Sequence, residues 1–335
     1  MRRNFRGHLH FGILFLIFVT LSYGQDFKKA VLDIPSKNIK SYSFDPGKPL
    51  ISRVSNIPEF LLDYMKKYDE RKDYTAYKPS EKEMSMIGEY LRLLPPVHKK
   101  VMKERLVGIY FINNFLGSGF TDYILSENNK IHTVLILNPS VLRSDLTNWL
   151  TYRENTCFIS NPEHRIEVNC GKEYTGLMYI LLHETTHIVD YILLFTPFVE
   201  PDMIKLGNYK KEKTALIEGI WDDYSLPAKS HDYSYRGNLT FYGIGGGPKI
   251  NISDAESVYK QLFNSPFISL YGSMSWAEDF AELVTFYHLT AKLKQPCMIK
   301  FYKGQELLYN LDPSQSPNVQ KRIKSLQSLY KLSGE

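Results

Sequence analysis

The feature that most constrains this chain is the motif His-Glu-Thr-Thr-His at residues 183–187, which lies inside a long apolar run. The run Tyr174–Leu194 contains no proline and a single glycine, so we expect a buried helix. Residues four apart share one face of a helix, so His183 and His187 can bind one metal ion. Glu184 would lie beside that ion, where its carboxylate can accept a proton from water.

A helix with hydrogen-bonded core histidines is the alternative interpretation of this motif. In a chain of 335 residues with 9 histidines, a chance match is expected in roughly one or two per cent of cases. Chance does not explain the apolar helical context, where two imidazoles and a carboxylate without partners would cost several kcal/mol. A metal ion supplies such a partner. Zinc is the leading candidate, because a catalytic zinc takes histidine and carboxylate ligands and leaves one position for water.

A third ligand is expected from the segment Trp276–His288, whose apolar residues recur at helical spacing. Glu278 and Glu282 are four apart and share one face of this helix. Two carboxylates on one face repel each other, so their proximity favours a cation or an imidazole N–H opposite them. One can bind the metal while the other accepts the outer N–H of a ligand histidine and fixes its tautomer. An ordinary solvated acidic stripe is the alternative.

These two segments resemble the gluzincin class of zinc metallopeptidases, in which a helix with His-Glu-x-x-His is followed by a second helix that carries a glutamate ligand. The motif layout is closest to anthrax lethal factor and the Pro-Pro endopeptidases. Their glutamate segment is similar to Glu278-Asp-Phe-Ala-Glu282, with a tyrosine seven residues earlier, which is Tyr271 here. Lethal factor also has an aspartate three residues after the second histidine, at the position of Asp190. The resemblance covers these two patches and a compatible order of elements.

The resemblance implies three zinc ligands: His183, His187 and Glu278. It implies Glu184 as general base, Tyr271 as stabiliser of the oxyanion, and Glu282 as a hydrogen-bond partner behind the ligands. Asp190 could support a ligand in the same way, and an ordinary hydrogen-bonded helix aspartate is equally open. Thr185-Thr186 departs from the relatives, which have a glycine in this pair, and proline specificity does not carry over. The implied fold is α+β and zincin-like, a two-lobed metalloprotease domain with a sheet-and-helix upper lobe, a mainly helical lower lobe and the metal between them.

The amino terminus predicts a secretory signal peptide over residues 1–24. Three arginines precede an apolar core, Phe11–Leu21, which is followed by the small-x-small sequence Ser22-Tyr-Gly24. This core is too short to span a bilayer. Cleavage after Gly24 would remove the three arginines and no acid, which lowers the formal net charge from +5 to +2. Neither a nucleic-acid partner nor a stable membrane anchor is indicated, and we expect a secreted or extracytoplasmic protein.

Residues 25–56 mix lysine, serine, proline and short apolar pieces, which favours an extended lead-in to a single zincin-like metallopeptidase domain over residues 57–335. Ser80-x-x-Glu83 is a capping box and predicts the start of a helix. Three strands are expected, at Leu106–Phe111, Asp122–Leu125 and His132–Asn138. Of these, Thr133–Leu137 is expected beside the cleft, because zincin folds bind extended peptides along an edge strand of the sheet.

Cysteines add one structural hypothesis. Cys157 and Cys170 flank a polar loop and could form a disulfide after export, with a stabilisation of up to roughly 3 kcal/mol. Two reduced cysteines are the alternative, and Cys297 is left without a partner in either case. The chain has no Cys-x-x-Cys pair, so zinc bound by cysteines is not indicated.

The sequence therefore predicts a secreted endopeptidase that binds one Zn²⁺ ion and hydrolyses protein or peptide substrates. Two alternatives stay open. One is a catalytically silent binding protein on a zincin scaffold, against which the intact Glu184 argues. The other is a zinc amidase that acts on non-protein amides such as cell-wall crosslinks, because the same water chemistry serves both reactions.

Overall fold

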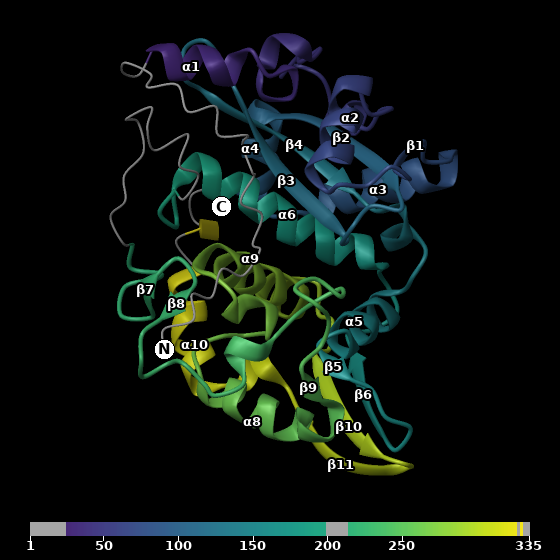
Figure 1. Cartoon of the computed structure of the whole chain (residues 1–335), viewed down its shortest axis with the longest axis vertical. Helices are drawn as coiled ribbons and strands as arrows, with labels where there is room; N and C mark the ends of the chain where they lie inside the picture. Colours follow the sequence, from purple (N-terminus) through teal and green to yellow (C-terminus); the bar gives the residue numbers. More distant parts are fainter. Residues whose placement is uncertain (1–24, 199–213, 327–328, 331–335) are drawn as a thin grey trace.

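The computed structural model of this chain describes residues 25–198, 214–326 and 329–330 (Figure 1). The expected signal peptide, residues 1–24, lies outside the described residues. Helices and β-sheets both occur throughout the described part of the chain. The α+β class predicted from the sequence is therefore confirmed.

The upper part of the molecule in Figure 1 is built on a four-stranded sheet with the order β1-β2-β4-β3. Its strands are β1 Thr75–Tyr77, β2 Leu106–Asn113, β4 Ile131–Leu137 and β3 Gly119–Leu125. β2 and β4 run parallel, whereas β1 and β3 each pair antiparallel with a neighbour. Residues of β2 and β4 are buried almost without interruption, which explains why both strands have continuous apolar sequences instead of alternating ones.

The strand at the edge of this sheet is not the one expected. Thr133–Leu137 belongs to β4, which lies between β2 and β3, so its main chain is already paired on both sides. The edge strands are β1 and β3, and β3 packs against the helix α6, Gly176–Leu193. The expectation was wrong because an apolar pattern does not report strand order. β3 follows β2 in the chain but pairs with β4 instead.

Three helices pack around this sheet: α2 Glu59–Tyr68, α3 Glu81–Leu93 and α4 Pro96–Arg105. The predicted capping box at the start of α3 is confirmed. The Ser80 hydroxyl accepts a hydrogen bond from the Glu83 N–H, and the Glu83 carboxylate accepts one from the Ser80 N–H. Pro96 stands in the first turn of α4, where the missing N–H of proline removes no helical hydrogen bond.

Residues 25–56 are not the extended lead-in that their composition favours. They form the helix α1, Gln25–Leu32, and then single 3-10 turns at Pro35–Lys37, Ile39–Ser41 and Leu50–Arg53. Asn38 forms a parallel bridge with Leu125 of β3, so this segment packs on the sheet. Turns of three or four residues are too short to show a helical period, which is why the pattern looked extended.

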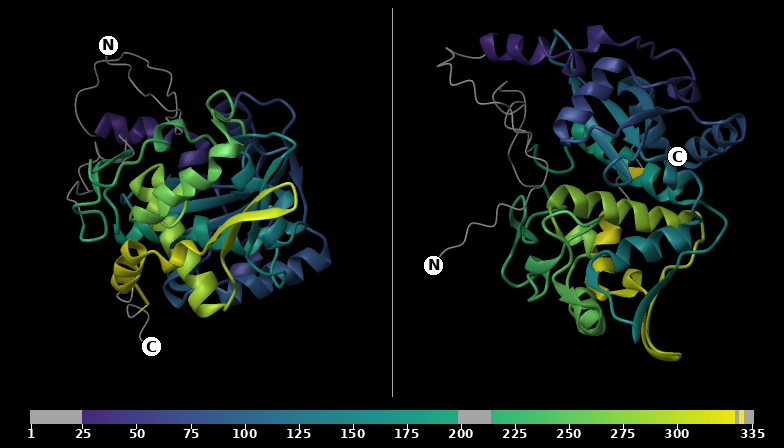
Figure 2. Two further views of the ribbon diagram at one scale, coloured as in Figure 1. Left: turned by 90° about the horizontal axis from the view of Figure 1, so that it is seen from below. Right: turned by 45° about the vertical axis from the view of Figure 1, so that its right-hand side comes forward.

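Two long helices cross the middle of the molecule and pack against each other, α6 and α9 Trp276–Tyr287 (Figures 1 and 2). α6 is buried over most of its length, as its apolar sequence predicts. It begins at Gly176, where a Cβ would lie 2.6 Å from an indole carbon of Trp149. It ends at Leu193 and is capped by Leu194, whose φ of 56° places it in the left-handed region.

The lower part of the molecule, below α9 in Figure 1, combines helices with a three-stranded antiparallel sheet of order β11-β10-β6. Its strands are β6 His164–Asn169, β10 Met298–Lys303 and β11 Glu306–Leu311. Its helices are α5 Leu146–Asn155, α8 Ala255–Asn264 and α10 Pro317–Ile323. Two further strand pairs are β5 Phe158–Ile159 with β9 Ile250–Asn251, and β7 Trp221–Asp223 with β8 Leu226–Pro227.

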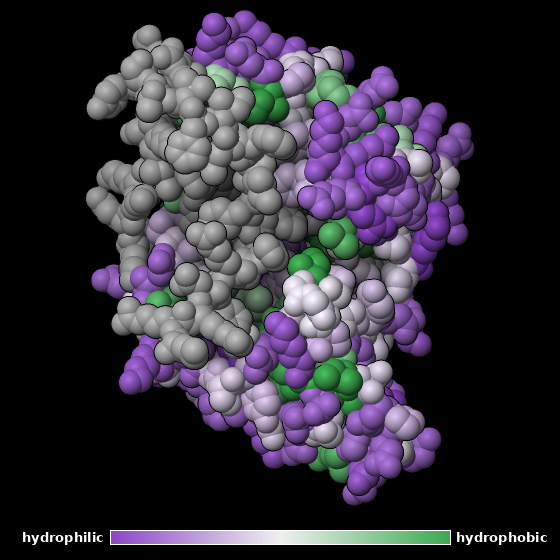
Figure 3. All heavy atoms as spheres, viewed as in Figure 1, coloured by the Kyte–Doolittle hydropathy of each residue, from purple (hydrophilic) through white to green (hydrophobic). Residues whose placement is uncertain are grey.

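The apolar core follows this layout. The main cluster of buried side chains includes α6 and α9, and a smaller one lies between α2 and the upper sheet. Hydrophilic residues cover the upper right of the face in Figure 3, and paler and apolar residues appear lower, at the level of α6 and α9. Within the described ranges, no helix is both long and apolar enough to cross a membrane.

The cysteines do not pair as the sequence suggested. Cys157, Cys170 and Cys297 are all free and buried. The Sγ of Cys157 lies 4.0 Å from the carbonyl oxygen of Arg153. Cys170 follows the last residue of β6, and its thiol contributes, with burial, to raising the pKa of Cys297 well above its usual value. The hypothesis of a Cys157–Cys170 bond was wrong because Cys170 hydrogen-bonds to Thr147 in the first turn of α5, whereas Cys157 follows the last turn of that helix.

Candidate metal centre

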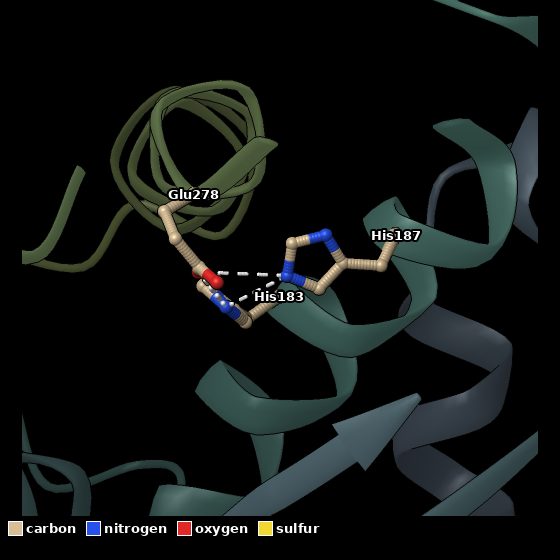
Figure 4. Close-up of side chains that lie close together, drawn as sticks. All are labelled: His183, His187 and Glu278. Atoms are coloured by element: carbon tan, nitrogen blue, oxygen red, sulfur yellow. Dashed lines mark hydrogen bonds and ion pairs between the residues drawn. The ribbon is translucent and has the colours of Figure 1, made fainter. Parts of the chain in front are cut away.

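His183, His187 and Glu278 converge between α6 and α9 (Figure 4). The two histidines come from successive turns of α6, and the glutamate comes from the first turn of α9. The Nε2 atoms of His183 and His187 lie 3.2 Å apart. Glu278 Oε2 lies 3.0 Å from His183 Nε2 and 3.5 Å from His187 Nε2. The three residues predicted from the sequence are thus brought together.

These separations fit one metal ion. Two ligand atoms bound tetrahedrally at about 2.0–2.1 Å lie about 3.3 Å apart, and the observed separations are 3.0, 3.2 and 3.5 Å. Glu278 Oε2 is buried and has no hydrogen bond of good geometry among the described residues, although two imidazole nitrogens face it. A shared cation would satisfy all three atoms at once. The set of two nitrogens and one carboxylate oxygen suits a divalent transition metal.

The pKa values of the metal-free ligands show how strongly this site favours positive charge. Burial lowers the pKa of His183, but Glu278 and Glu282 outweigh burial and raise it to about 10. Burial also lowers the pKa of His187, and the charge of Glu278 reverses that effect. Burial raises the pKa of Glu278, whereas the two imidazoles bring it below its usual range. A metal ion that binds here must therefore displace at least one proton.

Glu282 lies one turn after Glu278 and holds His183 from behind. It is fully buried and accepts a hydrogen bond of 2.9 Å from His183 Nδ1–H. This bond places the imidazole proton on Nδ1 and leaves Nε2 to face Glu278 and the metal position. The Ser269 hydroxyl donates a second hydrogen bond, 2.6 Å long, to the other Glu282 oxygen. One of the two glutamates thus accepts the outer N–H of a histidine, as expected from their helical spacing.

Arg153 also supports Glu282, a contact that no sequence pattern indicated. Its guanidinium, on α5, is 2 % exposed and lies 3.3 Å from both Glu282 oxygens. It also donates to the Tyr179 hydroxyl at 2.6 Å and to Glu154 at 2.8 Å. Burial raises the pKa of Glu282, but the charge of Arg153 and the hydrogen bond from His183 lower it to about 2. Glu282 therefore stays ionised beside the metal ligands.

Glu184 lies against the edge strand β3. The Thr121 hydroxyl lies 2.8 Å from Glu184 Oε2, to which it donates a hydrogen bond, and 3.0 Å from the main-chain oxygen of the same residue. Gly119 leaves the room that this carboxylate needs. A Cβ at this position would lie 2.8 Å from both Cγ and Oε1 of Glu184. The edge of the sheet thus fixes the glutamate next to the ligand histidines.

Tyr271 begins the 3-10 turn Tyr271–Ser273, which precedes α9. Its ring centroid lies 5.7 Å from that of His183, and the ring of Phe241 packs edge-on against it at 4.9 Å. Burial raises the pKa of Tyr271 well above its usual value, and the Glu278 carboxylate adds to this shift. The phenol therefore keeps its proton and can donate a hydrogen bond near the metal ligands.

The polar side chains of Thr185, Thr186 and Asp190 form hydrogen bonds within α6 or with the turn that follows it. The buried hydroxyls of Thr185 and Thr186 donate to the carbonyl oxygens of Leu181 and Leu182, at 2.6 and 2.7 Å. This pairing satisfies two polar side chains inside an apolar helix. Both carboxylate oxygens of Asp190 accept hydrogen bonds from Thr196, which orders the turn after α6. Such bonds fit the ordinary helix aspartate that the sequence left open for Asp190.

Comparison with protein-family models, with curated proteins and with solved structures finds no match for this chain. What the site can do must therefore be inferred from its own residues.

Proposed function

We propose that this protein is a zinc-dependent endopeptidase of the gluzincin type. The observation that carries the proposal is the convergence of His183, His187 and Glu278 at 3.0 to 3.5 Å, with Glu184 and Tyr271 beside them. Two imidazoles and one carboxylate are a ligand set of catalytic zinc, which keeps a further position for water or substrate. A purely structural zinc site would instead be closed by a fourth protein ligand.

When bound, zinc would supply Lewis acidity, which acidifies water and polarises a carbonyl group. The protein residues would supply the proton transfers. In this proposal, the Glu184 carboxylate accepts the proton of the attacking water and returns it to the leaving amine. The hydrogen bond from Thr121 to Oε2 leaves Oε1 as the oxygen that handles the proton. Fixing the carboxylate in advance reduces the reorganisation that the reaction requires.

Tyr271 is proposed to stabilise the oxyanion that forms on the substrate carbonyl. Its raised pKa keeps the phenol protonated over the physiological pH range, so it can donate a hydrogen bond as negative charge develops. The edge-on contact with Phe241 restrains its ring. The residue thus contributes most in the transition state, where the carbonyl oxygen carries its charge.

The edge strand β3 is the proposed docking site for the substrate backbone. β3 carries Gly119 and Thr121, the two residues that position Glu184. Among the described strands, β3 pairs only with β4, on one of its two sides. Asn38 bridges to β3 at Leu125, the end away from Gly119. An extended peptide can add to such an edge by main-chain hydrogen bonds. The sheet above α6 and the helices and small sheet below α9 would then form the two lobes of a zincin-like domain.

Zinc-loaded protein incubated with a peptide library tests the proposal. We expect cleavage at defined peptide bonds, with products identified by mass spectrometry. The Glu184→Gln variant should bind zinc as the parent does and lose activity by about 10²- to 10⁴-fold, because it lacks the general base. Equal activity of this variant would exclude Glu184 as the base. Absence of peptide cleavage, together with release of amines from cell-wall crosslinks, would assign the amidase alternative.

Export belongs to the proposal as well. The amino-terminal pattern over residues 1–24 is that of a cleaved signal peptide, and an extracytoplasmic location follows if it is used. Amino-terminal sequencing of the mature protein would show a start at Gln25 if cleavage follows Gly24.

A further inference from the structure

Cys170 and Cys297 come from distant parts of the chain and meet at one end of the lower sheet. β6 and β10 pair antiparallel, with Asn169 opposite Met298. One residue further in the same register, Cys170 lies opposite Cys297. Directly opposite residues of an antiparallel pair have Cα atoms about 4.5 to 5.5 Å apart. A disulfide spans Cα separations of about 4.4 to 6.8 Å, and residues paired in this register fall within that range.

The surroundings of the two thiols hold them in place. Cys170 is 2 % exposed and Cys297 is 4 % exposed. The neighbouring Cys170 thiol and burial together raise the pKa of Cys297 well above its usual value. The main chain at Cys170 is fixed by the Thr147 hydroxyl, which accepts from the Cys170 N–H at 3.0 Å and donates to the Gly171 carbonyl at 2.7 Å. Because both cysteines are buried and close together, their thiols can react with each other more readily than with a reagent in solution.

We propose that Cys170 and Cys297 form an intramolecular disulfide when the chain folds in an oxidising compartment. The two thiols lose two protons and two electrons, and one S–S bond forms. The electrons pass to the disulfide of a thiol–disulfide oxidoreductase or of oxidised glutathione, which is reduced to two thiols through a mixed disulfide. Because both sulfurs are buried in the folded protein, this exchange takes place during folding. Cys157 stays a thiol.

The position of this bond connects it with the candidate metal centre. The segment from 171 to 296 contains both α6 and α9, and therefore all three proposed ligands. The bond joins the chain just before α6 to the chain just after α9. A cross-link that closes so long a loop restricts the unfolded chain strongly, which favours the folded state. The inference shares the expectation of export with the proposed function and does not depend on zinc or on peptidase activity.

Peptide mapping of refolded protein tests the pairing. The full chain is unfolded, reduced, and refolded in a buffer of reduced and oxidised glutathione. Remaining thiols are then alkylated under denaturing conditions, and the peptides are mapped without reduction. We expect a linked peptide that contains Cys170 and Cys297, with Cys157 alkylated. Alkylation of all three cysteines, or a linked peptide that contains Cys157, would overturn the proposal.

Thermal unfolding of the metal-free protein gives a second readout. Protein refolded with glutathione should melt about 3 to 8 °C above protein refolded in a reducing buffer. Cys157→Ser should keep this difference, whereas Cys170→Ser and Cys297→Ser should each abolish it. A difference that persists in Cys297→Ser, or that disappears in Cys157→Ser, contradicts the assignment. Since no zinc or substrate is present, failure of the proposed function would leave these results unchanged.

Discussion

Replacing Glu282 by glutamine tests how the protein prepares His183 for a metal. Glu282 is fully buried and accepts hydrogen bonds from His183 Nδ1–H at 2.9 Å and from Ser269 at 2.6 Å, with the Arg153 guanidinium 3.3 Å away. Glutamine has the same shape as glutamate but no charge. Its NH₂ group is itself a donor and would face the donors that now bind the carboxylate, from His183, Ser269 and Arg153. Arg153 keeps Glu154 as a partner, so the cost lies at the lower end of that for breaking a buried ion pair, about 3 kcal/mol of folding stability.

The effect on metal binding follows from the same contacts. Loss of a carboxylate behind a ligand histidine typically weakens metal affinity by about 10- to 100-fold. This corresponds to about 1.4 to 2.8 kcal/mol of binding free energy. We expect the zinc dissociation constant of Glu282→Gln to rise within that range, measured by competition with a chromophoric chelator at constant pH.

Asp279→Asn is the matched control. Asp279 lies on the same helix, is also fully buried, and pairs with Arg322 through both oxygens at 2.7 and 2.8 Å. It adjoins the ligand Glu278, so any general loosening of α9 should affect both variants. We expect Asp279→Asn to lose comparable folding stability and to keep its zinc affinity within about twofold of the parent. Equal weakening of zinc binding in both variants would refute a specific role of Glu282 in orienting His183.

Two further predictions concern the tyrosine and the protons of the site. Tyr271→Phe should lower turnover by about 10²- to 10³-fold with unchanged zinc content, because it removes one oxyanion donor; unchanged turnover would remove Tyr271 from the mechanism. Zinc binding at pH 7.5 should release at least one proton, since His183 of the metal-free protein has a pKa of about 10. Zinc affinity should therefore rise about tenfold per pH unit between pH 6 and 8, as measured by titration calorimetry in buffers of different ionisation enthalpy; a pH-independent affinity would contradict the protonated state.

The convergence of the candidate ligands and several elements could be predicted because their signals are local. His183 and His187 are four residues apart on a helix, and their spacing alone places both imidazoles on one face. The prediction of Glu278 depended on the helical pattern of a second segment. The sequence did not show how close this helix lies to the histidines. The capping box at Ser80 and Glu83 lies within four residues, so sequence reasoning located it as the structure has it.

Other features depend on contacts between distant residues and carry no local pattern. Arg153 lies 129 residues from Glu282, and an isolated arginine on a short helix indicates no partner. The meeting of Cys170 with Cys297 depends on the β6–β10 register, whereas proximity in sequence suggested Cys157. The position of β4 inside the sheet depends on the path of the chain between strands, which hydropathy does not report.

The most direct test of the proposed zinc site is anomalous diffraction at the zinc edge from crystals of the zinc-loaded protein. We predict one strong peak between α6 and α9, about 2.0 to 2.2 Å from His183 Nε2, His187 Nε2 and a Glu278 carboxylate oxygen. The peak should keep its position in Glu184→Gln, because this residue is not proposed as a ligand. A peak bound elsewhere, or crystals that contain zinc without density between these three side chains, would contradict the central claim.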